Sequence, residues 1–135
     1  MTSKLHSTQL PVLIVDDDAG GSDALSGYLR YRGYRATVIR SGSEALRYLM
    51  GMAPDERPCL ILLDVLMPEL NGCQVLQQLK SRPETRAIPV IMLSVLSRDE
   101  IQDQLSDPCE GATSFLSKPF DLEKLVAEVD VYAHR

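Results

Sequence analysis

The stretch Leu60-Ile61-Leu62-Leu63-Asp64-Val65-Leu66-Met67-Pro68 places four apolar residues directly before a single carboxylate. So short an apolar run is typical of a strand buried on both faces, as in a parallel sheet covered by helices. In such sheets the carboxyl ends of the strands form the ligand crevice. We therefore expect Asp64 at the open end of a central strand, although an aspartate that merely starts a turn would give the same local pattern.

The length and composition of the chain are those of one ordinary globular domain. Its 135 residues are 44% hydrophobic and 24% charged, which is enough apolar material for one core. Its net charge of −5 argues against a nucleic-acid surface. No apolar run approaches the roughly 18 residues of a membrane span. We expect a flexible polar arm over residues 1–10, without a signal peptide, and one domain over residues 11–135.

The chain has three cysteines, Cys59, Cys73 and Cys109, which show no metal-ligand spacing and cannot all pair within one chain. This pattern favours thiols in a reduced, cytoplasmic setting, without a part in the chemistry. Cys109, beside Pro108 in a predicted loop, is the cysteine that we expect to be most exposed.

Strand patterns and helix patterns alternate along the chain. The predicted strands cover residues 11–15, 35–39, 60–63, 89–93 and 114–117. The predicted helices cover residues 20–32 and 72–81, and three more begin at the capping residues Ser41, Ser97 and Asp121. Strict alternation of this kind predicts an α/β fold, with a parallel sheet and helices on both of its faces.

Polar residues follow four of the predicted strands. Asp16 and Asp17 follow the first, and the others are Asp64, Ser94 and Lys118. Because the carboxyl ends of parallel strands lie along one edge, these side chains should gather there. Three carboxylates would repel one another unless a cation neutralises them. Mg²⁺ fits such oxygen ligands, since it takes one or two carboxylates together with phosphate oxygens.

A carboxylate beside a metal ion can act as a nucleophile and form an aspartyl-phosphate. The Lys118 ammonium supplies a compact positive charge for a phosphoryl oxygen. The Ser94 hydroxyl supplies a hydrogen-bond donor. The residue types therefore favour phosphoryl chemistry at Asp64.

Four motifs in this order and spacing resemble the receiver domain of two-component response regulators, over about residues 12–133. They are Ile14-Val15-Asp16-Asp17-Asp18, Leu63-Asp64-Val65-Leu66-Met67-Pro68 with Asn71-Gly72, Pro89-Val90-Ile91-Met92-Leu93-Ser94, and Gly111-Ala112-Thr113-Ser114-Phe115-Leu116-Ser117-Lys118-Pro119-Phe120. Each motif is weakly specific, but the set is highly specific. The resemblance implies a flavodoxin-like, doubly wound sheet of five parallel strands in the order 2-1-3-4-5, with five helices.

The resemblance also implies a role for each site residue. Asp64 is the phosphoacceptor, and Asp16, Asp17, Asp64 and the backbone carbonyl of Leu66 are the Mg²⁺ ligands. Lys118 contacts the phosphoryl group, Ser94 is the switch hydroxyl, and Phe115 occupies the aromatic switch position. We expect Asp18 to cap a helix or face solvent. The family usually has a cis peptide bond before the proline at position 119.

The implied function is that of a phosphoacceptor in two-component signalling. A sensor histidine kinase or phosphotransfer protein donates the phosphoryl group from a phosphohistidine, and a conformational change then controls an effector or output domain. The resemblance implies no turnover of a separate substrate, no direct nucleic-acid binding, no membrane contact, and a monomer or a weak phosphorylation-dependent dimer. The location it implies is cytoplasmic.

Several positions depart from the family pattern. Val95 stands where a small residue is usual, so it could narrow access to Asp64, and Phe115 lacks the hydroxyl of the commoner tyrosine. Thr113-Ser114 replaces an acidic pair of the transcription-factor subfamily, which argues against that subfamily's dimer. Leu66 and Leu96 flank the expected phosphoryl group, and neither can orient an attacking water, which predicts a long-lived phosphoaspartate.

Three other functions are compatible with parts of the sequence. A phosphohydrolase of the haloacid-dehalogenase type would use Asp16 and Asp18, but Gly20 departs from its motif and Asp64 is left unexplained. A pseudo-receiver would keep the fold without phosphorylation. The five intact site positions argue against it, while Val95 keeps that alternative open. A calcium loop at residues 16–18 fails on ligand spacing.

Overall fold

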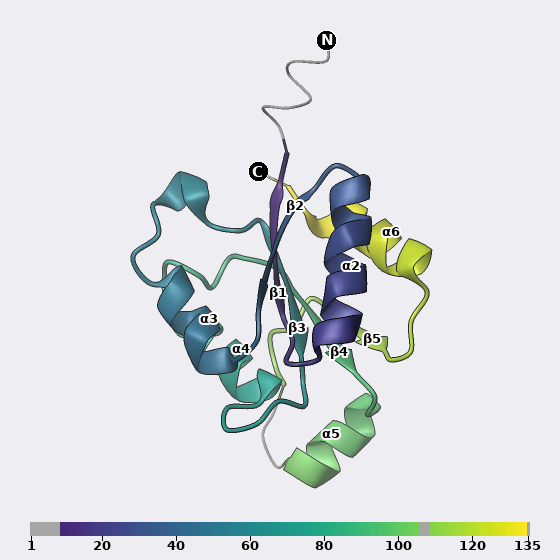
Figure 1. The fold of residues 1–135 in the computed structure, drawn as a ribbon. Coiled ribbons are helices and arrows are strands. Elements are labelled where there is room, and N and C mark those ends of the chain that lie inside the picture. Colours follow the sequence, from purple (N-terminus) through teal and green to yellow (C-terminus); the bar gives the residue numbers. More distant parts are fainter. Residues whose placement is uncertain (1–8, 106–108, 135) are drawn as a thin grey trace.

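The computed structural model describes residues 9–105 and 109–134. It confirms the predicted parallel sheet, whose five strands lie in the order β2-β1-β3-β4-β5 (Figure 1). The strands are β1 (Pro11–Val15), β2 (Arg35–Ile39), β3 (Leu60–Asp64), β4 (Val90–Ser94) and β5 (Ser114–Ser117). Most of the predicted N-terminal arm lies outside the described residues, as does Pro108.

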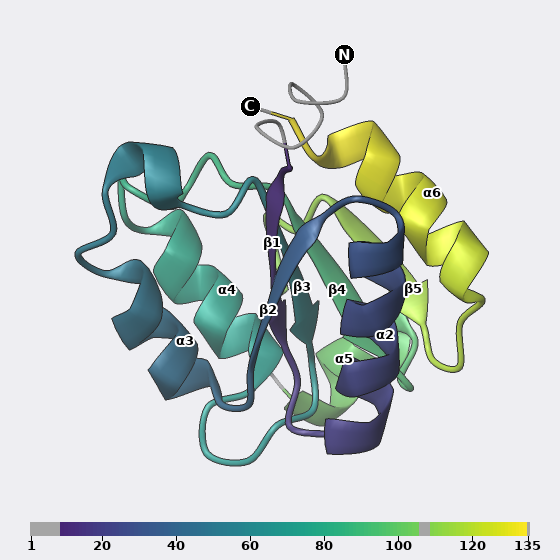
Figure 2. The same ribbon diagram turned by 45° about the horizontal axis from the view of Figure 1, so that its top comes forward.

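The described helices cover both faces of the sheet. They are α2 (Ala19–Tyr31), α3 (Gly42–Leu49), α4 (Gly72–Lys80), α5 (Arg98–Leu105) and α6 (Leu122–Tyr132), with a short 3-10 helix, η1 (Pro54–Glu56). Helices α2 and α6 cover one face, whereas α3 and α4 cover the other (Figure 2). None of the helices in the described part of the chain is both long and apolar enough to cross a bilayer.

Alternate residues of the central strands supply two apolar layers. Leu13, Ile61 and Met92 pack on the side of α3 and α4, and Ile101 of α5 joins them. Their neighbours Ile14, Leu62 and Ile91 pack on the side of α2 and α6. Because both faces are covered, every residue of β3 is buried. This explains why its sequence is a continuous apolar run rather than an alternating one.

The strand register brings the polar strand ends to one edge of the sheet. Val15 lies beside Leu63, and Asp64 beside Leu93. Ser94 is paired with Ser117, the residue before Lys118. The residues that follow β1, β3, β4 and β5 therefore share the carboxyl edge, near which α5 also lies (Figure 1).

Reciprocal capping contacts fix the starts of two helices at this edge. Asn71 accepts from the backbone N–H of Gln74 while its own N–H donates to the Gln74 side chain, both at 2.9 Å. Ser97 and Glu100 make the same pair of bonds at 3.1 and 2.8 Å, as predicted for α5. Each box supplies side-chain acceptors to two backbone N–H groups that would otherwise lack a partner at the start of the helix.

Two of the three cysteines form a disulfide, so the prediction that all three stay as thiols is wrong. Cys73 and Cys109 are joined, with their Cα atoms 4.7 Å apart. They are 36 positions apart in sequence, and they meet because Cys109 packs against the core cluster that contains Cys73. Cys59 is buried as a thiol whose Sγ–H donates to the Pro11 carbonyl.

Candidate functional site

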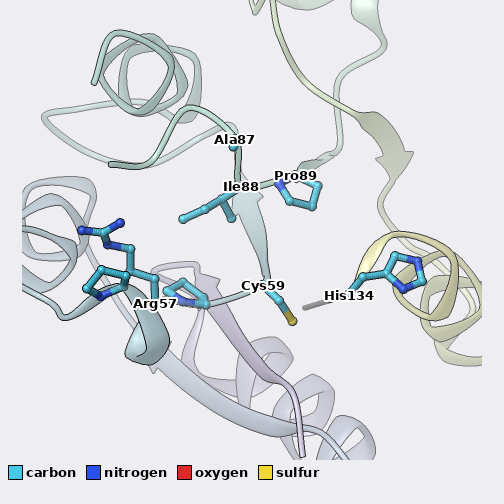
Figure 3. Close-up of a pocket in the computed structure, with 8 residues that line it drawn as sticks. Arg57, Cys59, Ala87, Ile88, Pro89 and His134 are labelled. Atoms are coloured by element: carbon cyan, nitrogen blue, oxygen red, sulfur yellow. The ribbon is translucent and has the colours of Figure 1, made fainter. Parts of the chain in front are cut away.

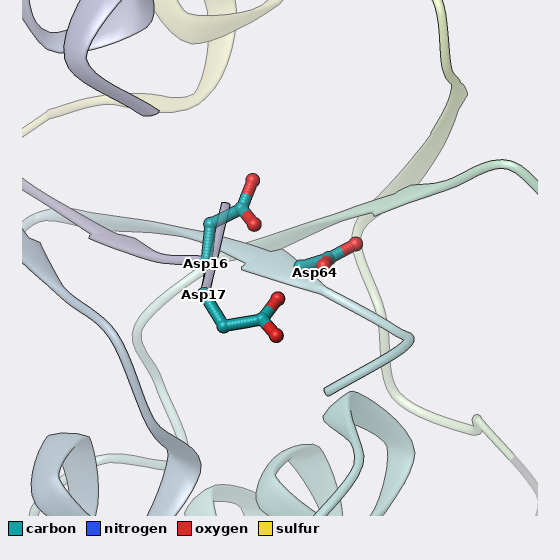
Figure 4. Close-up of side chains that lie close together, drawn as sticks. All are labelled: Asp16, Asp17 and Asp64. Atoms are coloured by element: carbon teal, nitrogen blue, oxygen red, sulfur yellow. The ribbon is translucent and has the colours of Figure 1, made fainter. Parts of the chain in front are cut away.

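Three carboxylates meet at the carboxyl edge of the sheet. Asp16 and Asp17 follow β1, and Asp64 ends β3, with one oxygen of each lying within 4.8 Å of the others (Figure 4). Asp16 and Asp64 are only 3% and 6% exposed, whereas Asp17 is exposed. The cluster is therefore buried on two sides and reached from solvent past Asp17. The structure brings together the acidic residues that the sequence predicted.

Lys118 reaches into this cluster from the end of β5. Its Nζ donates to Asp16 Oδ2 at 3.0 Å and lies 3.3 Å from Asp64 Oδ1. The backbone N–H of Lys118 donates to the Ser94 carbonyl at 2.7 Å, which continues the β4–β5 ladder to the lysine. The Lys118–Pro119 peptide bond is cis. One ammonium thus contacts two of the three carboxylates, Asp16 and Asp64.

Burial and charge repulsion raise the pKa of the Asp64 carboxyl well above its usual value. Burial, together with the charge of Asp16, raises the pKa of the Asp64 carboxyl to about 7, although Lys118 opposes the shift. Burial lowers the pKa of Lys118, but its contacts with Asp16 and Asp64 outweigh that effect, so the net direction is upward. The cluster carries more negative charge than its surroundings favour. A divalent cation would relieve this excess, and the all-oxygen donor set fits Mg²⁺.

The start of α4 packs directly on the backbone at the end of β3. A Cβ at Gly72 would lie 2.2 Å from the Asp64 carbonyl oxygen, so only glycine fits there. The Gly72 N–H donates to the Val65 carbonyl at 2.8 Å. These contacts fix the path of the backbone directly after Asp64.

Ser94 ends β4 and Phe115 lies in β5, and both make contacts with the β4–α5 region. The buried Ser94 Oγ accepts from the Leu96 N–H at 2.8 Å. The Phe115 ring is half-buried, and the Arg98 guanidinium carbon lies 4.3 Å from its centroid. Arg98 was not predicted, since only the fold brings the first residue of α5 over β5.

The three apolar residues around the site differ in exposure. Val95 is 62% exposed and Leu66 40% exposed, while Leu96 is half-buried against the core. Most of the Val95 side chain therefore faces solvent. Its narrowing of access to Asp64, and the influence of the two leucines on phosphoryl lifetime, stay predictions.

The contacts of Asp16 bear on the phosphohydrolase alternative. Asp16 Oδ2 accepts from Lys118, and its Oδ1 accepts from the Asp18 N–H at 3.0 Å. Both oxygens of this buried carboxylate are occupied, which argues against Asp16 as the nucleophile. Asp18 takes the N-cap position of α2 without a side-chain capping bond, and it lies outside the metal-type cluster of the described residues.

A separate hollow lies at the opposite edge of the sheet. It has a volume of about 270 Å³ and lies where β3 and β4 begin, beside Cys59 and Pro89 (Figure 3). Arg57 and His134 form part of its wall. Neither the carboxylates nor Lys118 line this hollow, so it is distinct from the acidic site.

The fold and the carboxylate–lysine cluster together define a receiver domain. The family model of the response regulator receiver domain matches residues 12–130. The chain therefore belongs to the response regulator receiver domain family, and its function lies in two-component signalling. The resemblance and the fold expected from the sequence are confirmed.

Two curated relatives illustrate the similarity. The DNA-binding dual master transcriptional regulator RpaA of Synechocystis is 36% identical over 92% of this chain and 49% of its own length. Response regulator MprA of Mycobacterium ulcerans is 34% identical over 92% of this chain and 50% of its own. The chain spans about half the length of these relatives.

Two solved structures show the same fold. The receiver domain of a signal transduction histidine kinase from Syntrophus aciditrophicus has a TM-score of 0.79 at 36% identity, covering 91% of this chain and 89% of its own. Chemotaxis response regulator CheY4 of Vibrio cholerae also has a TM-score of 0.79, at 27% identity, covering 93% and 99%.

Proposed function

We propose that Asp64 accepts a phosphoryl group from a phosphohistidine of a sensor histidine kinase or phosphotransfer protein. The contact that carries this proposal is the position of Lys118 Nζ, 3.0 Å from Asp16 and 3.3 Å from Asp64. It places a fixed positive charge beside the one carboxylate that ends the central strand. The exposed Asp17 leaves an approach for the donor.

In this reaction an Asp64 carboxylate oxygen attacks the phosphorus atom, and the nitrogen–phosphorus bond of the donor breaks, leaving its electron pair on the imidazole. Negative charge spreads over the phosphoryl oxygens during transfer. Lys118 would stabilise that charge by donating to one of these oxygens in place of the Asp64 oxygen it now faces.

Mg²⁺ would be held by Asp16, Asp17, Asp64 and the backbone carbonyl of Leu66. When bound, it supplies the charge that lets a carboxylate and a phosphoryl group approach each other. The three aspartates already place one carboxylate oxygen each within 4.8 Å of the others, as such an ion would require.

Phosphorylation would then bias a two-state switch. A phosphoryl oxygen offers the Ser94 hydroxyl a charged acceptor, and this draws Ser94 away from its present bond to the Leu96 N–H. Phe115 would turn into the space that Ser94 leaves. The same site would assist its own phosphorylation and dephosphorylation, without turnover of a separate substrate.

The partners proposed for this domain are a kinase or phosphotransfer protein on one side and an effector or output domain on the other. The acidic balance of the chain, −5, gives no reason to expect direct nucleic-acid binding by this domain. We propose a cytoplasmic domain that is a monomer, or a weak dimer when phosphorylated, and that makes no membrane contact.

Phosphoryl uptake from acetyl phosphate tests the assignment of Asp64. With Mg²⁺, the intact mass of the wild-type chain should rise by one phosphoryl group, and EDTA should prevent the rise. Asp64→Asn should abolish uptake, whereas Asp103→Asn, on the exposed side of α5, should not. Labelling of Asp64→Asn to the wild-type extent would show that another residue is the acceptor.

A further inference from the structure

The disulfide Cys73–Cys109 connects the phosphoacceptor side of the site to the loop between α5 and β5. Cys73 is the second residue of α4 and is 1% exposed. Cys109 is half-buried and lies two residues before Gly111. The bond is thus a covalent link between the helix that follows Asp64 and the segment that leads into β5.

The Cys73 end of this link is anchored to the acceptor strand. Gly72, the residue before it, donates to the Val65 carbonyl at 2.8 Å and lies so close to the Asp64 carbonyl that no side chain fits. The first turn of α4 therefore cannot shift without disturbing the end of β3. This end of the disulfide is a fixed point.

The Cys109 end belongs to the part of the domain that we expect to move. The loop it begins packs at Gly111 (φ 94°) against the Lys80 side chain, then joins the sheet where the Thr113 N–H donates to the Val90 carbonyl. Phe115 follows in β5, under Arg98 of α5. A link at Cys109 restrains the connection between these two switch residues.

We propose that Cys73 and Cys109 form a reversible thiol–disulfide site whose oxidised form holds the switch in its resting arrangement. The coupling rests on the proposed function of Asp64, while the thiol chemistry does not. The domain does not need a disulfide for stability, because apolar layers already cover both faces of the sheet. In the cytoplasmic location proposed above, a disulfide would be transient or redox-sensing more often than structural.

Thiol–disulfide exchange with a low-molecular-weight thiol gives a balanced reaction. A glutathione thiolate attacks Cys109 Sγ, the more accessible sulfur, and the electron pair of the broken bond passes to Cys73 Sγ, which takes up a proton. A second glutathione thiolate attacks the mixed disulfide and releases the Cys109 thiol. Overall, two glutathione thiols become one glutathione disulfide, and the protein gains two thiols.

The departing Cys73 thiolate would form in the first turn of a helix of nine residues, where backbone N–H groups favour negative charge. Cys59 does not compete, because it is buried at the opposite end of β3 with its thiol donating to Pro11. The chain therefore has one pair that can cycle between the two states.

Because the coupling is reciprocal, the effect of the disulfide on the switch can be measured as an effect of the phosphoryl mimic on reduction of the disulfide. If the disulfide favours the resting arrangement, a phosphoryl mimic that favours the switched one must make the disulfide easier to reduce, by the same factor. We expect beryllofluoride with Mg²⁺ to lower the ratio [GSH]²/[GSSG] at half-reduction by about fivefold or more, the lower end of typical allosteric couplings.

The experiment is a glutathione titration of the full chain, with and without Mg²⁺ and beryllofluoride, quenched by alkylation and read by intact mass. Mimic binding is followed separately by NMR in the oxidised and the reduced chain. Cys109→Ser should abolish the redox transition, and Cys59→Ser is the matched control that should keep both the transition and its shift.

Three results would overturn the proposal. They are a pair that never oxidises in glutathione buffer, a transition that survives Cys109→Ser, and a midpoint that the bound mimic leaves unchanged. Failure of the mimic to bind in either redox state would overturn the proposed function and, with it, the coupling. This outcome is distinguishable from failure of the thiol chemistry, because NMR would show no mimic binding while the glutathione titration without mimic would still show the Cys73–Cys109 transition.

Discussion

Two groups of residues around Asp64 differ in how complete their contacts are. In the first group, Asp16, Asp17 and Lys118 gather around Asp64, with Lys118 Nζ 3.3 Å from an Asp64 oxygen; we call these with Asp64 the acidic half. In the second group, Ser94 is bonded to the Leu96 N–H and Phe115 packs under Arg98; we call Ser94, Arg98 and Phe115 the switch half. The charged groups of the acidic half already contact one another, whereas the residues of the switch half are held in contacts away from Asp64.

Under the proposed function, this difference would allow one small domain both to take up a phosphoryl group and to change conformation. A charge cluster that accelerates transfer must be arranged before the reaction, so that no reorganisation is needed at that moment. A switch must instead have a second arrangement that a new charge can favour. Each prediction below concerns one half or the boundary between them.

The largest effect concerns the charge excess of the acidic half. Because folding raises the pKa of Asp64 from 3.8 to about 7, the folded chain binds this proton more tightly than the unfolded chain. The stabilising contribution is complete below the unfolded pKa and is lost as the pH rises through the folded one. Without metal, the unfolding free energy should fall by on the order of 2–3 kcal/mol between about pH 4 and pH 7.

Urea unfolding in EDTA measures this slope. Asp64→Asn should remove most of the loss within the window, because the amide does not ionise, while the exposed Asp103→Asn should keep the wild-type slope. Equal slopes in wild type and Asp64→Asn would show that the acidic half is not under charge repulsion.

The second prediction separates neighbours in the acidic half. Asp17 belongs to the cluster, whereas Asp18 lies at the N-cap of α2. Asp17→Ala should weaken Mg²⁺ binding by at least about tenfold, as expected when a group that shapes a metal site is lost. Asp18→Ala should change it far less. Calorimetric titration of both variants decides, and equal losses would place Asp18 in the site.

The boundary between the halves should set the lifetime of the phosphoaspartate. Leu66 and Leu96 are both apolar, so neither can position an attacking water. Replacing them together, Leu66→Asn with Leu96→Glu, should speed dephosphorylation by about tenfold or more, since a positioned base can then activate water. Decay of the phosphorylated chain is followed by intact mass after removal of the donor. A wild-type decay as fast as that of the double variant would refute the idea.

The smallest effect concerns the switch half. The Arg98–Phe115 contact of 4.3 Å should contribute about 0.5–1 kcal/mol, the usual range for an exposed cation–π pair. Arg98→Ala should therefore raise the switched population of the unphosphorylated chain by a factor of about two to five. Arg47→Ala, at an exposed position on α3, is the matched control.

Fluorine NMR can follow this population, because the chain has only two phenylalanines, Phe115 and Phe120, and fluorophenylalanine would give two signals. The Phe115 signal should move in Arg98→Ala toward its position in the mimic-bound chain. An unchanged Phe115 signal would show that Arg98 does not hold the ring.

The acidic half could be predicted from the sequence because each of its residues is marked by the residues immediately before it in the chain. Continuous apolar runs mark strands with two covered faces, and a polar residue directly after such a run must lie at the carboxyl edge. Asp16, Asp64 and Lys118 were located in this way, and the order of the strands followed from the resemblance. The structure confirms that arrangement.

The features that were missed depend on contacts between distant segments. Nothing in the spacing of Cys73 and Cys109 predicts a disulfide, since their proximity arises from the packing of Cys109 on the core cluster that contains Cys73. Arg98 and Phe115 meet for the same reason. The Asn71–Gln74 box, in contrast, is a local signal, because an asparagine followed three residues later by a glutamine can mark the start of a helix.

Amide hydrogen exchange with and without beryllofluoride and Mg²⁺ tests the distinction between the two halves most directly. It should be done on the reduced chain, where the link at Cys109 does not restrain the switch. We predict that exchange changes in α5 and β5 (Arg98–Leu105 and Ser114–Ser117) and stays nearly constant in β1 and α2. Changes confined to the immediate neighbours of Asp64, or equal changes in β1 and α2 and in α5 and β5, would contradict the account.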